Sequence, residues 1–379
     1  MKHAFATWVY SAGVFVCIVT GAQAATYRMV DLEALTGTGE SWAYDVNDAG
    51  QAVGAFYTGG YSHPCIWQNG SVSYINTMPY AYDGVAYGIN NNGLVVGNSG
   101  FAWLWQNNAI SVVQDTYHAR QLAGPCSTND DGQVAGQFYT GSSVPYTEPP
   151  GVPVTHACVW QNGSVLDLGT LNPDQYYARS EALSNNDNGQ VVGWSDAVNG
   201  GFHACLWQDG SITDLGFLPG GNGSSQANAI NDLGQVVGMS YADRGGSHAF
   251  TWYDGTMTDL GAGYSAQDIN DDGDIVGTNP QGHACLWQNG SPTDLGVLPG
   301  SDVSVAYSIN AKGEIVGYSY NYNQGNHHRA TLWEPVPEPT SALAVLCGIG
   351  GLIAVVRTNK WPAAQPNARS KRDNHKAQA

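Results

Sequence analysis

The sequence predicts an all-β fold, a seven-bladed β-propeller closed by an N-terminal strand. A phrase of the form Ala-x-x-Ile-Asn-x-x-Gly-x-Val-Val-Gly, followed by His-Ala-x-Leu-Trp, recurs seven times between Ala43 and Trp333, with substitutions in individual copies. Each copy holds four short segments of strand character, except that the fourth segment of the last copy is found at the amino end of the repeats. Four strands in a period of roughly 40–45 residues are typical of a propeller blade.

Each copy predicts two β-hairpins in succession. In the sixth copy, the first hairpin joins residues 266–270 to 274–277 through an Asp-Asp-Gly turn, and the second joins 283–287 to 292–295 through an Asn-Gly turn. Asn and Gly tolerate positive φ, which tight hairpin turns require. The third segment is apolar on both sides, as a strand covered on both faces must be.

The two ends of the repeat array predict how the ring closes. The seventh copy stops at Trp333-Glu334-Pro335 without a fourth strand, whereas residues 29–35 match the fourth strand of an ordinary copy, 166–171. Pairing the first strand of the chain with the last three removes two exposed sheet edges. An open solenoid of hairpins is the alternative, but it would need capping repeats. We therefore assign residues 25–335 to one closed propeller.

The amino end has the three parts of a secretory signal peptide. A basic start of three residues is followed by an apolar run to Val19 and by the small-x-small exit Ala22-Gln23-Ala24. We therefore expect export and removal of residues 1–24. A core helix or membrane anchor is the alternative, but the run is short for a bilayer span.

The carboxyl end carries a second change of composition. The motif Pro337-Glu338-Pro339 precedes a 17-residue apolar run, 340–356, which is followed by Arg357 and Lys360. A run of this length is the lower limit for a transmembrane helix, and the cations after it favour a cytoplasmic end. We therefore expect a C-terminal transmembrane helix beside the propeller.

This order of parts resembles the PEP-CTERM sorting signal of bacterial envelope proteins. The resemblance covers residues 336–360 and implies processing by an exosortase-type membrane enzyme that reads Pro337, Glu338 and Pro339, in organisms that make extracellular polysaccharide. Family members usually stop soon after the basic cluster, whereas this chain continues as a basic tail, 361–379, which we expect to be disordered. A permanent membrane anchor is the alternative to processing.

The region between the two end signals is strongly acidic. Residues 25–335 carry 29 Asp and Glu against six Lys and Arg, which gives a net charge of −23. Such a surface repels phosphate backbones and anionic lipids, so nucleic acid is excluded as a partner. It is compatible with cations and neutral glycans, and it also serves solubility alone.

Five cysteines remain after removal of both signals. Four of them occupy one repeat position, and equivalent positions of different blades lie too far apart for a disulfide. We interpret these four as small buried hydrophobes. The four are Cys65, Cys158, Cys205 and Cys285, and the fifth is Cys126.

Two recurring patterns suggest metal ligands, and both have a simpler interpretation. Histidines open the third segment of five copies, but ring-equivalent positions are too far apart for one coordination sphere, so we expect hydrogen bonds to a neighbouring strand or loop. Residues 268–274 have the oxygen spacing of a calcium loop, but the twelfth position is Asn279 rather than an acid. The turn asparagine recurs whatever acids surround it, so we expect it to cap its own turn, with no metal and no cofactor. The histidines are His63, His156, His203, His248 and His283.

The unit is similar to the HAF family of extracellular repeats. The likeness is carried by His248-Ala249-Phe250, by residues 230–238 before it and by Thr258-Asp259-Leu260-Gly261 after it, and it covers 26–334. Only one copy keeps Phe at the third position, the second copy lacks the His, and the seventh has Arg329 in its place. The resemblance implies export, repetition and cell-surface residence, and no established chemistry.

The functional prediction rests on the loops and on the absence of catalytic signatures. The long links fall on one face of the ring, the longest being 137–155, and loops on a rigid scaffold carry variable function. We predict a non-enzymatic surface protein that binds or organises extracellular glycan or another envelope component, with ligand contacts from Tyr139, Tyr146, Tyr176 and Tyr177. The alternative is a carbohydrate-active hydrolase or lyase whose acids converge on the channel. The acids outside the repeat pattern are Glu40, Asp83, Asp115, Glu148 and Glu181.

Overall fold

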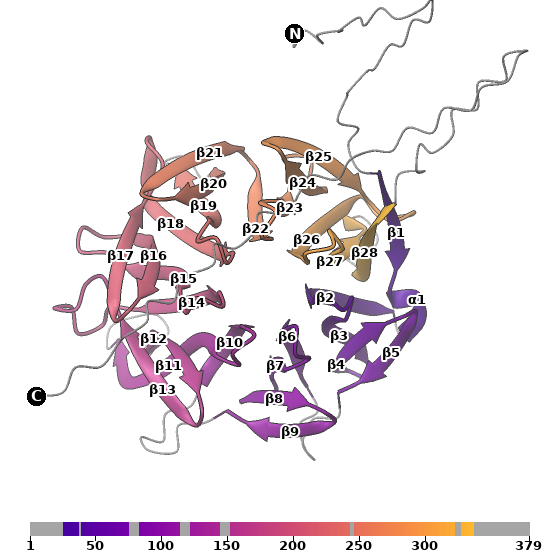
Figure 1. The fold of residues 1–379 in the computed structure, drawn as a ribbon, viewed down its shortest axis with the longest axis horizontal. Helices are drawn as coiled ribbons and strands as arrows, with labels where there is room; N and C mark the ends of the chain where they lie inside the picture. Colours follow the sequence, from indigo (N-terminus) through magenta and orange to yellow (C-terminus); the bar gives the residue numbers. More distant parts are fainter. Residues whose placement is uncertain are drawn as a thin grey trace, which may run out of the picture. The chain divides into compact units, whose positions relative to one another are not determined.

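Seven four-stranded antiparallel sheets surround a central axis, so the predicted seven-bladed propeller is confirmed (Figure 1). The computed structural model describes residues 26–37, 39–75, 83–113, 122–144, 152–242, 246–322 and 327–336. The predicted signal peptide, the sorting motif Pro337-Glu338-Pro339, the transmembrane segment and the basic tail lie outside these ranges. Within the described ranges, no helix is long and apolar enough to span a bilayer.

Each blade runs from an inner strand beside the axis to an outer strand at the rim (Figure 1). Blade 1 contains β2 (Glu40–Val46), β3 (Ala52–Thr58), β4 (Tyr61–Gln68) and β5 (Ser71–Tyr74). Blade 2 contains β6 (Val85–Ile89), β7 (Val95–Asn98), β8 (Ala102–Gln106) and β9 (Ala109–Val112). Blade 3 contains β10 (Leu122–Thr128), β11 (Val134–Val144), β12 (Val152–Gln161) and β13 (Ser164–Gly169). Blade 4 contains β14 (Ser180–Asn185), β15 (Val191–Asp196), β16 (Phe202–Gln208) and β17 (Ser211–Gly216).

The remaining blades follow the same order. Blade 5 contains β18 (Gly221–Ile230), β19 (Val236–Ala242), β20 (Ser247–Tyr253) and β21 (Thr256–Ala262). Blade 6 contains β22 (Ser265–Ile269), β23 (Ile275–Thr278), β24 (Ala284–Gln288) and β25 (Ser291–Gly296). Blade 7 contains β26 (Val303–Ile309), β27 (Ile315–Tyr320), β28 (Arg329–Val336) and, as its outer strand, β1 (Thr26–Asp31). A short helix, α1 (Glu33–Thr36), follows β1.

A β-bulge in every inner strand explains the glycine of the Val-Val-Gly segment. In blade 1, Ala43 pairs with Gly54 and Asp45 with Val53, so Tyr44 is the extra residue. The inner strand then crosses closely over its neighbour: a Cβ added at Gly54 would lie 1.9 Å from the backbone oxygen of Trp42. Any side chain at this glycine would push the inner strand away, which is why the bulge and the glycine recur together.

The hydrophobic core lies between neighbouring blades. Trp287 of blade 6 packs with Ala229 and Val237 of blade 5, and Trp333 of blade 7 packs with Leu286 of blade 6. The four repeat cysteines are buried in the same layers, and none of the five described cysteines forms a disulfide. The interpretation of these four cysteines as small buried hydrophobes is confirmed.

The ring closes as predicted, with β1 as the fourth strand of blade 7. Strand β1 pairs antiparallel with β28, from Thr26 opposite Val336 to Asp31 opposite Thr331. It begins three residues before the expected Met29, because the ladder continues as far as the end of β28. Val30 of β1 lies opposite Leu332 of β28, and Trp333 of β28 lies opposite Ile315 of β27. This is the strand order that the offset repeat predicted.

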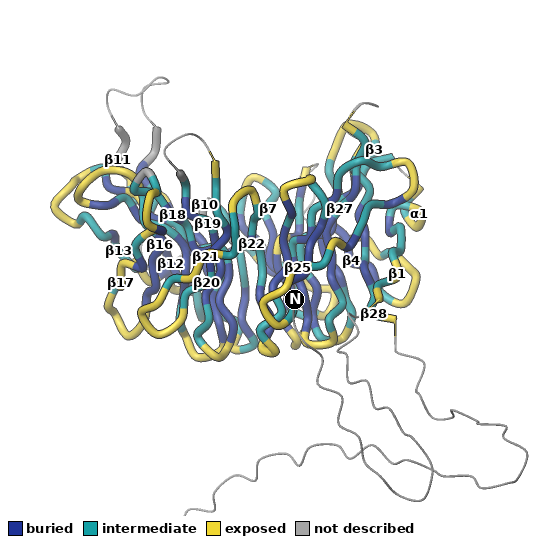
Figure 2. The backbone as a smooth tube through the Cα atoms, turned by 90° about the horizontal axis from the view of Figure 1, so that it is seen from above, coloured by how far each residue is buried: buried dark blue, intermediate teal, exposed yellow. Residues whose placement is uncertain are grey.

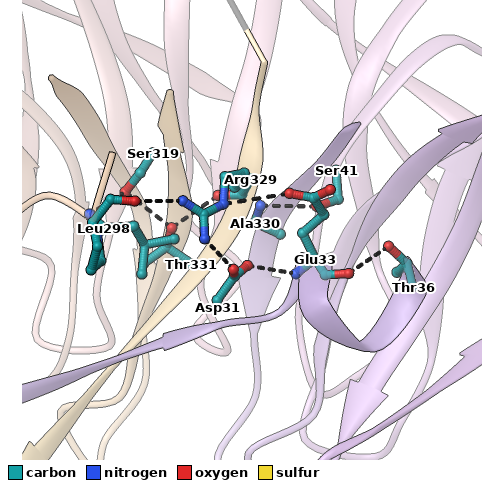
Figure 3. A network of polar contacts seen from close by, with 10 residues as sticks. Asp31, Glu33, Thr36, Ser41, Leu298, Ser319, Arg329, Ala330 and Thr331 are labelled. Atoms are coloured by element: carbon teal, nitrogen blue, oxygen red, sulfur yellow. Dashed lines mark hydrogen bonds and ion pairs between the residues drawn. The ribbon is translucent and has the colours of Figure 1, made fainter. Parts of the chain in front are cut away.

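An arginine fastens this closure (Figure 3). Arg329 forms an ion pair with Asp31, lies 3.5 Å from a carboxylate oxygen of Glu33, and donates a hydrogen bond of 2.9 Å to the backbone oxygen of Pro299. In an ordinary blade the same two positions hold a His–Asp pair, such as His156 and Asp167. The departure of the seventh copy therefore places an ion pair where the first strand of the propeller, β1, meets the last strand, β28.

The two faces of the ring differ in their connections. Strands alternate in direction within each blade, so the Asn-x-x-Gly and Asn-Gly turns share one face of the ring, the turn face. The other links share the opposite face, the loop face. The strands are buried midway and exposed at the turns of both faces (Figure 2). The predicted loop 137–155 is wrong in part: β11 and β12 extend into it as a bulged ladder, because its Tyr, Thr and Val residues suit a strand. Tyr139 therefore lies on a strand.

Candidate functional site: the central channel

At the turn face, the channel ends in a closed ring of hydrogen bonds between blades. The asparagine after each inner strand donates from Nδ2 to the backbone oxygen of its counterpart in the next blade, at 2.8–3.2 Å. Each also accepts N–H groups of its own turn, as Asn47 does from Ala49 and Gln51. The predicted capping role is confirmed, but one side chain also ties two blades. The members of this asparagine ring are Asn47, Asn90, Asn129, Asn186, Asn231, Asn270 and Asn310.

A second ring, one residue further along each turn, is open at one place. In six blades, a backbone N–H donates to an Asn or Asp side chain of the following blade at 2.7–2.9 Å. The break lies between Asp271 and Ala311, because alanine offers no acceptor. We call this set the acidic rim, and its members are Asp48, Asn91, Asp130, Asp187, Asp232, Asp271 and Ala311.

Two partly buried carboxyl groups lie just inside the acidic rim. Asp45 accepts hydrogen bonds from Ser308 at 2.7 Å and from the N–H of Ile89 at 2.8 Å, so it links three blades. Asp268 accepts from the N–H of Ile309 at 2.9 Å. Burial, reinforced by the charge of Asp45, raises the pKa of Asp268 to about 7, although its hydrogen bonds act in the opposite direction. Burial also raises the pKa of Asp45.

The candidate calcium loop is engaged in other contacts. Asp271 accepts the N–H of Asp232, and Asp274 accepts a hydrogen bond from Gln288 at 2.8 Å. Since Asp268 binds backbone N–H groups, the acids of this loop point to separate partners. Within the described ranges, no group of three or more His, Cys, Asp and Glu side chains is placed to hold a metal ion. The rim and these acids enclose a cavity of about 230 Å³.

The loop-side half of the channel holds a larger cavity of about 590 Å³, within the range of small-ligand sites. Tyrosines from blades 7, 1 and 2 form one side: the ring centre of Tyr44 lies 5.6 Å from that of Tyr87 and 5.4 Å from that of Tyr307. Tyr307 continues the series to Tyr318 at 5.6 Å. We call these four residues the tyrosine wall. The residues that line the loop-side cavity are Tyr44, Tyr87, Asn98, Gly124, Cys126, Glu181, Leu183, Gln226, Asn228, Gln267 and Tyr307.

The opposite side of the loop-side cavity is polar. Gln226 and Asn228 of blade 5 and Gln267 of blade 6 supply amide groups, and Gln226 donates to Asn228 at 2.8 Å. Glu181 of blade 4 is the one carboxylate among the described lining residues. It accepts hydrogen bonds from Gln137 at 3.0 Å and from the indole of Trp194 at 3.1 Å. Burial raises the pKa of Glu181, and the bond from Trp194 offsets this in part.

The three described tyrosines among those predicted to bind ligand lie away from the lining of this cavity. Tyr139 on β11 is 48% exposed, and Tyr176 is 73% exposed in the link between β13 and β14. Tyr176 and Tyr177 contact each other edge to face at 4.9 Å, while Tyr146 lies outside the described residues. The sequence did not single out Tyr44, Tyr87 and Tyr307, because they belong to the repeat segment. The sequence holds a signal that could have identified them, because the residue at this position of the repeat changes between blades.

The acids outside the repeat pattern separate into different environments. Glu181 lines the loop-side cavity, whereas Asp83 accepts the N–H of Ser62 at 2.8 Å in a link. Glu40 lies at the start of β2, and Asp115 and Glu148 lie outside the described residues. Of the five acids, the structure therefore brings one to the channel cavity.

The repeat histidines have structural partners. The Nδ1 atoms of His156, His203, His248 and His283 lie 2.8–3.1 Å from carboxylates on the neighbouring fourth strand. In blade 1, the ring of His63 stacks on Phe56 at 5.5 Å instead. The predicted bonds to a neighbouring strand are confirmed in four blades. His248 and Asp259 also line a cavity of about 270 Å³ at the loop-side edge of blade 5.

The chain matches no protein-family model and no curated protein. Among solved structures, it is similar to a puromycin-hydrolysing peptidase of Mycobacterium tuberculosis, at 10% identity, over 84% of this chain and 57% of that one, with a TM-score of 0.48. It is similar to an acylaminoacyl peptidase of Pyrococcus horikoshii at 12% identity, over 79% and 52%, with a TM-score of 0.46. It is also similar to a lectin of Aleuria aurantia at 9% identity, over 80% and 98%, with a TM-score of 0.35. The chain thus spans little more than half of either peptidase, and the likeness is one of fold.

Proposed function

We propose that this protein is an exported envelope protein that binds glycan in the loop-side cavity. The observation that carries the proposal is the division of that cavity into a tyrosine wall and an amide side. Aromatic faces pack against the apolar face of a sugar ring, and amides both donate and accept hydrogen bonds, as hydroxyl groups do. A neutral glycan satisfies both sides of the cavity at once.

The departure from the repeat supports the same assignment. Tyr44, Tyr87 and Tyr307 occupy a position that is Leu183 in blade 4 and Asn228 in blade 5. A position that tolerates such different side chains is not required by the blade. The choice of three tyrosines on adjacent blades therefore calls for a role other than folding.

The exposed tyrosines on the same face extend the proposal. Tyr139 and the Tyr176–Tyr177 pair belong to blade 3 and to the link that leads to blade 4. A glycan longer than the cavity would leave it on the loop face, where these rings are available. We assign them an accessory role, with the principal contacts made by the cavity.

The location of the protein is proposed from its two ends. The features of residues 1–24 support export, and those of residues 336–360 support retention in the envelope until an exosortase-type enzyme acts at Pro337-Glu338-Pro339. A protein delivered to the surface of a polysaccharide-producing cell meets extracellular glycan. Replacing the three motif residues by alanine should leave the precursor in the membrane fraction. A processed product with unchanged yield would contradict the sorting role.

The hydrolase alternative needs a pair of carboxylates. Glycosidases place two carboxyl groups on the order of 5–10 Å apart across the bond that they cleave. Among the residues that the structure describes, Glu181 is the one carboxylate lining the loop-side cavity, and Asp45 and Asp268 are engaged deeper in the channel. This arrangement favours binding over hydrolysis.

The test is a glycan array followed by titration calorimetry on the best binder. Tyr44→Ala should weaken that binder about 10-fold or more, about 1.4 kcal/mol, because it removes the central ring of the tyrosine wall. Tyr253→Ala, which removes an exposed tyrosine of blade 5, is the matched control and should leave affinity unchanged. Equal losses in both variants, or no binder on the array, would contradict the proposal. Release of reducing ends that is abolished by Glu181→Gln would favour the hydrolase instead.

A further inference from the structure

We propose that the loop-side cavity prefers sugars that carry a protonated amine over their neutral and acidic counterparts, with Glu181 as the counter-ion. This inference rests on the proposed function, because it concerns the same cavity. The inference starts from the carboxylate of Glu181, whose two side-chain hydrogen-bond partners are neutral. Gln137 and Trp194 each donate one hydrogen bond to Glu181.

Glu181 retains capacity for a further donor. A carboxylate offers about four acceptor sites, of which these two bonds occupy two. None of the ion pairs among the described residues includes Glu181. The basic residue beside it in sequence, Arg179, is paired with Asp196 at 3.3 Å and lies over the ring of Trp194. A ligand ammonium group would supply the missing cation.

The blade does not require this acid. Glu181 is two residues before Leu183, and the equivalent residue is Trp42 in blade 1, Gly124 in blade 3 and Gln226 in blade 5. No common structural role fits residues so different in size and polarity. Glu181 is therefore a feature of this one blade and of the cavity that it lines.

The rest of the channel favours the same charge. Tyrosine faces attract cations through their ring quadrupole, and three of them line the cavity together with Glu181. Among the described residues that line the cavity, none is Lys, Arg or His. At the other end of the channel the acidic rim adds five aspartates, and the potential of such a lined cavity attracts cations and repels uronates.

The experiment compares three oligosaccharides of equal length by calorimetry at low salt: glucosamine, N-acetylglucosamine and glucuronate oligomers. The glucosamine oligomer should bind at least 10-fold more tightly than the N-acetylated one, and the glucuronate oligomer should bind most weakly. Glu181→Gln, which keeps an acceptor for Trp194, should reduce the amine preference, the ratio of the affinities for the glucosamine and N-acetylglucosamine oligomers, at least fivefold.

A matched control separates the cavity from the general acidity of the surface. Asp209→Asn removes one exposed charge from a turn at which other blades carry asparagine, such as Asn162 and Asn289, and it should leave the preference intact. Equal loss of preference in both variants would overturn the inference in favour of long-range attraction. Tighter binding of the neutral oligomer, with sensitivity to Tyr44→Ala, would overturn it while leaving the proposed function in place. Absence of binding by every oligomer would remove both.

Discussion

The two halves of the channel are built from the same seven inner strands but follow opposite rules. At the turn face, every blade contributes asparagine, and the seven side chains form one closed ring. In the loop-side cavity, the extra residue of the inner-strand bulge varies between blades, from Tyr44 to Cys126 to Asn228. The difference teaches that identical residues in this fold serve closure, whereas departures from the repeat gather in the cavity that we propose as the ligand site.

The largest expected effect comes from breaking the asparagine ring. Asn186→Ala removes the bond to the oxygen of Asn231 and leaves buried groups of its own turn unpaired, including the N–H of Gln190. We expect a loss of about 2–4 kcal/mol in the free energy of unfolding by denaturant. Asn188→Ala, an exposed neighbour in the same turn, is the control and should cost less than about 1 kcal/mol. Comparable losses in the two variants would remove the distinction between ring and turn.

Breaking the ring closure at Arg329 should have the second-largest effect on stability. Arg329→Ala breaks the partly buried ion pair with Asp31 and the exposed hydrogen bond to Pro299, and should cost about 1–3 kcal/mol in the same measurement. Arg28→Ala removes a far more exposed ion pair with Glu334 on the same strand pair, and should cost about 0.5 kcal/mol or less. If Arg28 mattered as much as Arg329, the ion pair at the repeat position would have no special role.

A pH titration probes the buried acids beneath the rim. The pKa of Asp268 is raised from 3.8 to about 7, so the folded state binds more protons than the unfolded state between these values. Its contribution to stability is complete below about pH 4 and is lost as the pH rises to about 7. Thermal unfolding should therefore show a falling Tm across this window, with a smaller fall in Asp268→Asn. The same slope in both proteins would show that the titration belongs to other groups.

The smallest effect sharpens the account of the rim. Ala311→Asn supplies the acceptor that the N–H of Asp271 lacks, and completes the second ring without adding charge. One net hydrogen bond at an exposed site should stabilise the fold by about 0.5–1 kcal/mol, with a rise in Tm of about 1–3 °C. A fall in Tm would mean that the gap is needed, and not merely tolerated.

Much of the fold was predictable because the same four-strand pattern recurs seven times in the sequence. The strand number, the closure by β1 and the inter-blade tryptophans follow from spacing and from the offset copy. The ring of hydrogen bonds between blades was not predictable, because an asparagine that only caps its own turn has the same sequence pattern as one that also bonds to the next blade. Ligand contacts were predicted in the loops at Tyr139 and Tyr176, because loops usually carry function. The channel tyrosines of the proposed site were not predicted, because they lie inside the repeat. Glu181 was singled out by its departure from the pattern, and that criterion also identifies Tyr44, Tyr87 and Tyr307.

The central claim is that departures from the repeat bind ligand and that repeated residues hold the ring. It is tested most directly by measuring both glycan affinity and unfolding free energy for Tyr44→Ala and Asn186→Ala. We predict that Tyr44→Ala loses about 10-fold or more in affinity at a smaller cost in stability than Asn186→Ala, and that Asn186→Ala binds normally while folded. Loss of affinity in Asn186→Ala with normal binding by Tyr44→Ala would contradict the claim.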